Sequence, residues 1–232
     1  MLPSFTIHRA GWPIILGFIL ITLILFSFSL ILGGIGLLLT IWCIYFFRDP
    51  VRMVPQGDSF VVSPADGLIQ SIEQASMPKE LELEGTFLKI SIFLNVFDVH
   101  VNRTPLEGVL VKSIYHPGQF LNASFDKASE LNERHSYLLR TTYSKGKSRT
   151  TADIAFVQIA GLVARRIVSE VEVGDHLGCG QRIGIIRFGS RVDVYLPQDC
   201  SPIVAVGQRV VGGETILADL NLTHSERTFV EI

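Results

Sequence analysis

The sequence predicts a mostly β (α+β) domain preceded by an N-terminal membrane hairpin of two helices. Three observations lead to this prediction: a long N-terminal run without charged residues, several strand-like segments after it, and an internal repeat built around glycine turns. Every acidic residue, and every lysine or arginine except Arg9, follows Phe47. We therefore expect a membrane-anchoring hairpin over residues 1–47 and the chemically active domain over residues 48–232.

The N-terminal run is too long for a signal peptide and lacks a small-residue cleavage site, so we expect the protein to retain it. As one straight helix, segment 11–47 would extend about 55 Å, well beyond a ~30 Å hydrocarbon core. The pair Gly33-Gly34 divides it into predicted helices 12–32 and 35–47, of which the second is short. We expect both ends in the cytoplasm, with the active domain on the cytoplasmic side of the inner cell membrane. One tilted pass followed by an interfacial helix stays open.

Strand patterns dominate the rest of the chain. Short apolar or alternating runs predict strands at 60–63, 88–94 and 108–115. Helical patterns are fewer: 122–135 is a polar candidate, and 159–167 fits either a short helix or a strand.

Segments 171–183 and 204–216 share the frame V-x-V-G-x-x-(L/V)-x-x-G-x-x-I at an offset of 33 residues. Each copy predicts a strand, a tight glycine turn and a second strand. This arrangement resembles the barrel-sandwich hybrids of biotinyl and lipoyl carriers. Such carriers need a lysine at a hairpin tip, and neither copy has one, so the pattern supports the fold and not the carrier function.

Composition argues against several other classes of protein. The net charge of −2 does not suggest a nucleic-acid partner. The three cysteines lack CxxC spacing, so neither a zinc site nor a disulfide framework is expected. Asp98 and His100 could contact a metal from one strand face, but no third ligand is suitably spaced, and we expect no metal.

Three short stretches contain residues that could carry chemistry: Ser63-Pro64-Ala65-Asp66-Gly67, the run "FDVHVNRTP" at 97–105, and the pair Gly189-Ser190 within "FGSRVDVYLP". Taken singly, each has an ordinary structural explanation. Asp66 fits a turn, His100 fits a structural or solvated position, and Gly189-Ser190 fits a β-bulge.

Together, the three stretches resemble the short form of the phosphatidylserine decarboxylase proenzymes. Two further segments carry the same resemblance, "YHPGQFLNASFDKASELNER" at 115–134 and "QIAGLVARRI" at 158–167. The similarity covers nearly all of residues 48–232 and preserves the order of the motifs.

The resemblance implies a pyruvoyl enzyme whose prosthetic group comes from its own serine. The Ser190 hydroxyl would attack the Gly189 carbonyl, and cleavage would leave a large β chain, 1–189, paired with a small α chain, 190–232. The pyruvoyl group made from Ser190 would form a Schiff base with phosphatidylserine, release carbon dioxide and leave phosphatidylethanolamine.

The resemblance also implies roles for other residues. His100 would be the base that activates Ser190, and Asp66 would orient it. Many relatives carry a second histidine three positions after the first, where this chain has Arg103. The role that two histidines share elsewhere would therefore fall to His100 alone or to His100 with Arg103. Possible substrate contacts are Arg103, His116, Arg165 and Arg166. For the last two, a solvated basic pair stays open.

Other functions remain open at this point. Within the pyruvoyl class, the substrate could be another serine-headgroup lipid, archaetidylserine, or a soluble amino acid, although a membrane anchor favours a lipid. A non-enzymatic membrane-anchored adaptor would remain one intact chain. A metallopeptidase would need clustered histidine ligands, which the sequence lacks.

Overall fold

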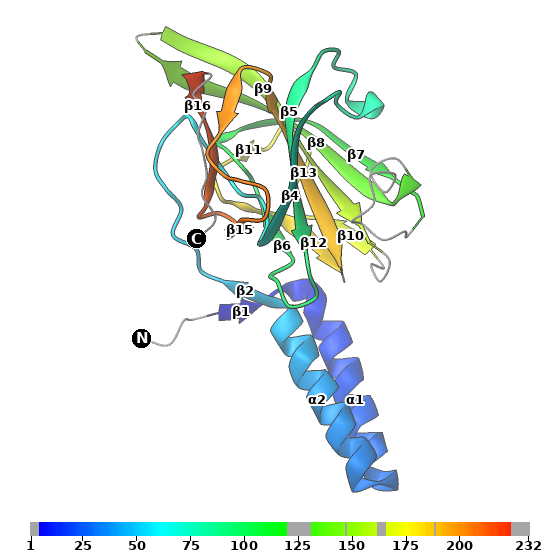
Figure 1. Ribbon diagram of the computed structural model, residues 1–232. Coiled ribbons are helices and arrows are strands. Elements are labelled where there is room, and N and C mark those ends of the chain that lie inside the picture. Colours follow the sequence, from blue (N-terminus) through cyan, green and yellow to red (C-terminus); the bar gives the residue numbers. More distant parts are fainter. Residues whose placement is uncertain (1–4, 120–130, 147, 162–165, 188, 224–232) are drawn as a thin grey trace.

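The computed structural model describes residues 5–119, 131–146, 148–161, 166–187 and 189–223. A β domain forms one end of the molecule, and two long helices extend from it side by side (Figure 1). Short elements join the two parts at the base of the domain: β1 (Phe5–Ile7), the 3-10 helix η1 (Arg9–Gly11) and β2 (Arg48–Pro50). Strands β1 and β2 pair antiparallel, so both ends of the hairpin are tied together.

The helical hairpin consists of α1 (Trp12–Phe28) and α2 (Leu30–Phe46). Our prediction of the break was wrong: the chain turns at Ser29 rather than at Gly33-Gly34, and the two arms are equal at 17 residues each. Ser29 has an extended backbone (φ −161°, ψ 138°), and its Oγ accepts a hydrogen bond from the Ile31 N–H. Gly33 lies inside α2, where the absence of a Cβ leaves space for the Phe26 ring.

Small and hydroxyl residues hold the two helices together. A Cβ on Gly36 would lie 2.9 Å from the Thr22 Oγ1, so glycine is needed for this close approach. The hydroxyls of Thr22 and Thr40 are buried and hydrogen-bonded to each other at 2.9 Å. This is the packing expected between helices in lipid, where apolar surface alone gives little driving force. Segment Arg9–Phe28, with a mean hydropathy of 2.3, is long and apolar enough to cross a membrane.

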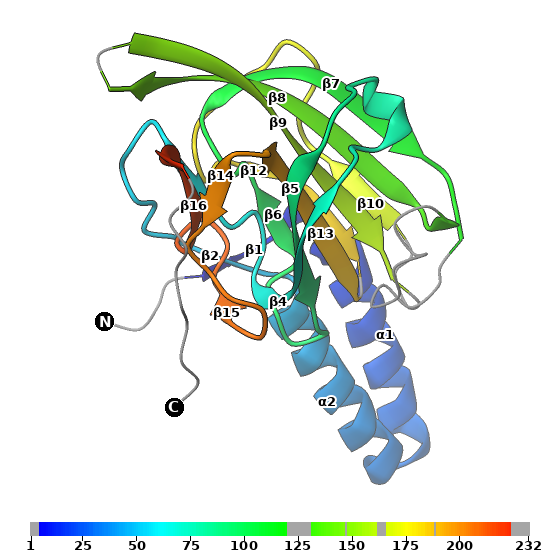
Figure 2. The ribbon, with the colours of Figure 1, turned by 45° about the horizontal axis from the view of Figure 1, so that its top comes forward.

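Within the described residues, the largest sheet has eight strands in the order β11-β7-β8-β9-β13-β5-β4-β15, and every neighbouring pair is antiparallel. The sheet curls into a half-barrel (Figure 2). Its strands are β4 (Gly67–Ala75), β5 (Phe87–Leu94), β7 (Gly108–His116), β8 (Arg134–Lys145), β9 (Ser148–Ala160), β11 (His176–Leu177), β13 (Ser190–Pro197) and β15 (Arg209–Val210).

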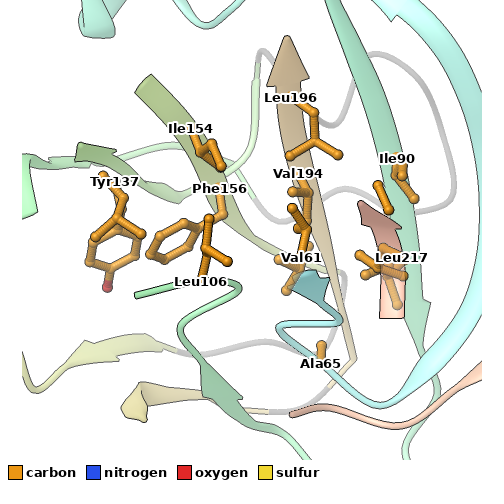
Figure 3. Packing of buried hydrophobic residues seen from close by; sticks show 14 of the residues in the cluster. Val61, Ala65, Ile90, Leu106, Tyr137, Ile154, Phe156, Val194, Leu196 and Leu217 are labelled. Atoms are coloured by element: carbon orange, nitrogen blue, oxygen red, sulfur yellow. The ribbon is translucent and has the colours of Figure 1, made fainter. Parts of the chain in front are cut away.

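Two three-stranded sheets cover the concave face of the half-barrel, in the orders β10-β12-β6 and β14-β16-β3. Their strands are β3 (Phe60–Val62), β6 (Val101–Arg103), β10 (Arg166–Ser169), β12 (Arg182–Arg187), β14 (Cys200–Pro202) and β16 (Ile216–Thr223). Figure 3 shows the core between the sheets, where Val61 and Leu217 of the small sheet pack near Ile90 and Val194 of the large one. This mostly β architecture confirms the predicted fold class.

The predicted repeat is present in the structure. Its four shared glycines, Gly174, Gly180, Gly207 and Gly213, all have positive φ, between 72° and 98°. The turns also make equivalent contacts. Gly174 N–H donates to the Leu110 carbonyl at 2.9 Å, and Gly207 N–H donates to the Ile69 carbonyl at 2.9 Å. The frame read from the sequence therefore records two copies of one strand-turn-strand unit.

The structure shows a second pair of equivalent segments, outside the repeat that was recognised in the sequence. Segments 63–67 and 104–108 form equivalent turns before β4 and β7. Ser63 exchanges backbone hydrogen bonds with Gly213 and Thr215, and Thr104 does the same with Gly180 and Gln181. Each turn ends at a glycine that lies against the backbone of the next strand, Gly67 against Phe93 and Gly108 against Arg140.

The remaining predicted elements have mixed outcomes. The predicted strands 60–63, 88–94 and 108–115 correspond to β3, β5 and β7. Most of the predicted helix 122–135 lies outside the described residues, and its last two residues belong to strand β8 instead. Segment 159–167 ends one strand and begins another, with residues 162–165 outside the described part of the chain.

We predict that Gly108→Ala destabilises the domain by about 1–3 kcal/mol, because overpacking of this order follows when backbone must move. The new Cβ would lie 2.6 Å from the Arg140 carbonyl oxygen. Gly178→Ala is the matched control, since its Cβ would meet only the Gln181 Oε1, at 3.8 Å. Denaturant unfolding in detergent would measure both, and equal midpoints would contradict the close approach.

Candidate functional site

Ser190 is the first residue of β13, the strand that lies between β5 and β9. It pairs with Leu94 on one side and Ala160 on the other. The side chain is fully buried, and its Oγ has no hydrogen-bond partner among the residues that the structure describes. A buried hydroxyl without a partner is uncommon and costs about 1–3 kcal/mol, so this one calls for an explanation beyond packing.

Gly189 precedes the strand in a conformation that favours glycine, with φ at +64° and no atom within 4 Å of the position a Cβ would take. Its carbonyl oxygen accepts a hydrogen bond from the Gly161 N–H at 2.9 Å. The Gly189 carbonyl is therefore polarised by a fixed donor, and no described residue other than the chain neighbours of Gly189 crowds its Cα. Both properties suit attack at that carbonyl.

His100 lies just before β6, and its backbone carbonyl accepts from the Ile186 N–H at 3.3 Å. Its ring is fully buried, and Nδ1 lies 3.0 Å from the Asp98 carbonyl oxygen. Because a carbonyl can only accept, Nδ1 carries the proton and Nε2 carries the lone pair. In the described part of the chain, Nε2 has no hydrogen-bond partner. Burial lowers the pKa of His100 to about 4, so the ring is neutral at pH 7.

A buried polar row connects the sheets that carry these two residues. Tyr137 Oη donates to Gln158 Oε1 at 2.9 Å, and Gln158 Nε2 donates to Asn102 Oδ1 at 2.7 Å. Asn102 lies two residues after His100, and Gln158 pairs with Val192, two residues after Ser190. Side chains two apart on a strand share a face. From this spacing we infer that Ser190 and His100, which directly precedes β6, face the same space between the sheets.

Sequence reasoning missed this polar row. Gln158 interrupts the apolar run "IAFVQIA", and Asn102 follows His100 at strand spacing. A polar side chain in a buried strand is a signal of a partner across the core, but the sequence does not say which strand faces it.

Asp66 reaches the same end of the large sheet, because Leu68 pairs with Phe93 and Phe93 pairs with Arg191. Its carboxylate accepts two hydrogen bonds from Arg52 Nη2, at 2.9 and 2.8 Å, and one from the Gly212 N–H at 2.7 Å.

Within the described chain, none of the hydrogen bonds of Asp66 goes to His100. The group that orients His100 is the Asp98 carbonyl. An orienting role for Asp66 stays a prediction.

Arg103 is buried and bound to the segment that leaves the membrane hairpin. Its guanidinium donates to the Asp49 carboxylate at 3.1 Å and to the Pro50 and Gly180 carbonyls at 3.0 Å each. These contacts describe a side chain that fixes the junction between hairpin and domain. A role in substrate handling stays a prediction.

The other expected contact residues are placed less centrally. His116 is the exposed last residue of β7. Arg166 is exposed at the start of β10 and pairs with Arg187, two residues before Gly189. Arg165 lies outside the described residues. No three His, Cys, Asp or Glu side chains cluster as a metal site would require in the part of the chain that the structure describes.

We predict that Arg103→Ala lowers the free energy of unfolding by about 3 kcal/mol, because it breaks a buried ion pair with Asp49. Arg140→Ala removes a more exposed pair with Asp153 and should cost much less, because solvent screens that pair. Denaturant titration of both variants in a Ser190→Ala background keeps cleavage out of the measurement. Equal losses would show that the Arg103 pair contributes no more than a surface one.

Comparison with known proteins identifies the family of this chain. The family model for phosphatidylserine decarboxylase matches residues 39–218. A phosphatidylserine decarboxylase proenzyme of Rickettsia akari is 53% identical over 214 residues, covering 92% of this chain and 90% of the relative. One from Rickettsia typhi is 51% identical over 221 residues, covering 95% and 93%. By the extent of the family match and the identity to these proenzymes, the chain belongs to the phosphatidylserine decarboxylase family.

Proposed function

We propose that this chain cleaves itself between Gly189 and Ser190 and then decarboxylates phosphatidylserine to phosphatidylethanolamine and carbon dioxide. The observation that supports the proposal is a pair of buried groups, the Ser190 hydroxyl and the His100 Nε2, neither of which has a hydrogen-bond partner among the described residues. One is a nucleophile that needs to lose a proton, and the other is a base with a free lone pair. Membership of the decarboxylase family supports the same reaction.

Self-cleavage needs only groups of the chain and one water. His100 Nε2 takes the proton of the Ser190 hydroxyl, and Oγ adds to the Gly189 carbonyl while Gly161 N–H stabilises the developing oxyanion. The C–N bond then breaks, which leaves an ester and a free amine at residue 190. Loss of the Ser190 α-proton expels the Gly189 carboxylate and leaves dehydroalanine. Water hydrolyses its imine tautomer to a pyruvoyl group and ammonia.

The buried environment of Ser190 fits a carbonyl prosthetic group. When present, the pyruvoyl group of this family supplies an electron sink for loss of carbon dioxide from an α-amino acid. The protein holds residue 190 between Leu94 and Ala160 and keeps bulk water from it. His100, neutral and without a partner at Nε2, can accept or return a proton in the same space.

The two products of cleavage, 1–189 and 190–232, should remain one particle. The small chain contributes β13, which pairs with β5 and β9, and β16, which pairs with β3. Separation would expose both edges of a central strand, so a heterodimer is the expected mature form.

The apolar hairpin supports action on a lipid at the bilayer surface. The hairpin joins the base of the domain (Figure 1), and His100 contacts Phe46, the last residue of α2. A hairpin inserted in a bilayer would therefore hold His100 close to the membrane surface. We place the domain on the cytoplasmic side of the cell membrane. The flanking arginines Arg9, Arg48 and Arg52 are consistent with this orientation under the positive-inside rule.

The first test is cleavage. Purified protein should contain two chains with masses of 1–189 and of 190–232 bearing a pyruvoyl end, and liposomes with carboxyl-labelled phosphatidylserine should release label without added pyridoxal phosphate. Ser190→Ala should remain one chain and release none. Active protein that is a single intact chain would refute the pyruvoyl mechanism. Turnover of an archaetidylserine or of free serine, with none of phosphatidylserine, would refute only the substrate.

The second test is the pH dependence of self-cleavage. Protonation of Nε2 removes the lone pair, so the rate should fall as pH drops through the pKa of His100, which burial sets at about 4. We expect a constant cleavage rate from about pH 8 to pH 5 and a half-maximal rate near pH 4. The intact mass of newly made proenzyme, recorded over time at each pH, measures this rate. His100→Ala should be slower by about 100-fold or more. An acid limb near pH 6.5 would indicate a solvated imidazole instead.

A further inference from the structure

We infer that the end of the membrane hairpin is part of the self-cleavage site, because Phe46 and Arg48 hold the segment 95–100 that carries His100. Phe46 and Arg48 are then positioning residues, and the hairpin is more than a tether. This inference rests on the proposed role of His100 as the base for Ser190.

Phe46 contacts His100 directly. It is the last residue of α2 and fully buried, and its ring centroid lies 4.3 Å from that of His100 at an interplanar angle of 34°. The contact belongs to an apolar cluster that joins the two parts of the protein: Ile15, Cys43, Phe46, Phe47, Val99, Val101 and Ile185. A ring that covers one face of the imidazole limits its rotation and keeps water from that face.

Arg48 fixes the chain on the other side of the histidine. Its Nη2 donates to the Phe97 carbonyl at 2.7 Å, its Nη1 donates to the Tyr45 carbonyl at 2.8 Å, and its guanidinium lies 3.7 Å from the Tyr45 ring centre. Phe97 precedes Asp98, whose carbonyl accepts from His100 Nδ1. A chain of direct contacts therefore leads from the hairpin to the tautomer that leaves Nε2 free.

The turn that carries Asp98 has its own support, so Arg48 sets its position rather than its shape. The Asp98 N–H donates to the Asn95 carbonyl at 3.0 Å, and the Asn95 N–H donates to Asp98 Oδ2 at 2.9 Å. Asp98 Oδ1 also pairs with Arg209. Loss of Arg48 should therefore shift a preformed turn relative to Ser190 and leave the fold intact.

The charged groups around His100 give the inference a specific readout. Burial is the main cause of its lowered pKa, and Arg48 lowers that pKa further, while the Asp98 carboxylate is neutralised by Arg209. Opening the ring to water or removing the Arg48 charge should each raise the pKa of His100 toward 6.5. Loss of packing elsewhere in the same cluster should leave it unchanged.

The test uses full-length proenzyme made in lipid nanodiscs, with cleavage followed by intact mass after transfer to each pH. We expect Phe46→Leu and Arg48→Gln to slow cleavage at pH 7 by about 10-fold and to move the acid limb above pH 4, less in Arg48→Gln because the Arg48 charge is a smaller cause of the lowered pKa than burial. Phe47→Leu is the matched control. It loses a ring from the same cluster, one that packs edge-on against Phe46 at a centroid distance of 5.1 Å and lies over Gly11, whereas Phe46 itself contacts His100.

Stability is measured separately by unfolding each variant in a Ser190→Ala background. Phe46→Leu and Phe47→Leu should lower stability alike, and Arg48→Gln should change it little. A shift of the acid limb in Phe46→Leu and Arg48→Gln, but not in Phe47→Leu, therefore supports a positioning role. Acid limbs equal to that of the unmodified chain in Phe46→Leu and Arg48→Gln would overturn the inference. Should Phe46→Leu fail to fold, Arg48→Gln decides alone. Cleavage of His100→Ala at the normal rate would instead refute the role of His100.

Discussion

The antiparallel pairing of β13 between β5 and β9 is the constraint on which the site depends. The strand begins at Ser190, so the first residue of a central strand is also the residue at which we propose cleavage. Pairing on both sides holds its backbone, while Gly189, just outside, keeps the freedom that attack on its carbonyl needs. Chemistry can then proceed without disturbing the core, and the new chain end stays in place.

The same pairing explains why the duplicated architecture carries only one site. Segments 63–67 and 104–108 are equivalent turns, and Asp66 and Glu107 occupy the same position in them. Asp66 is bound by Arg52 and the Gly212 N–H at the end of the sheet where Ser190 lies. Glu107 is largely exposed and lies 3.8 Å from an exposed His176. The two turns have equivalent backbone hydrogen bonds, but only the turn that contains Asp66 lies at the end of the sheet where β13 begins.

The sequence was most informative where geometry demands a residue type. Four glycines predicted the repeat because each requires positive φ, and the Gly189-Ser190 pair was found through its motif. The hairpin break was misplaced because Gly33 serves helix packing, while the turn depends on the backbone of Ser29. Contacts such as Gln158 with Asn102 join residues 56 positions apart. No local pattern specifies such a pair, so the partners of the site residues could not be predicted.

Buried groups without partners make the unprocessed chain a higher-energy form at this one place. The Ser190 hydroxyl and the His100 Nε2 are each enclosed without a hydrogen bond, and such a group costs about 1–3 kcal/mol. The fold tolerates that cost because the surrounding sheets bury a continuous apolar core, and because Phe46 at the end of the hairpin packs against His100. In the proposed maturation, conversion of Ser190 to a pyruvoyl group removes both its hydroxyl and its amide N–H, while the pairing of Arg191–Pro197 with β5 is retained. The proposed reaction would therefore remove one of these two buried groups, the Ser190 hydroxyl.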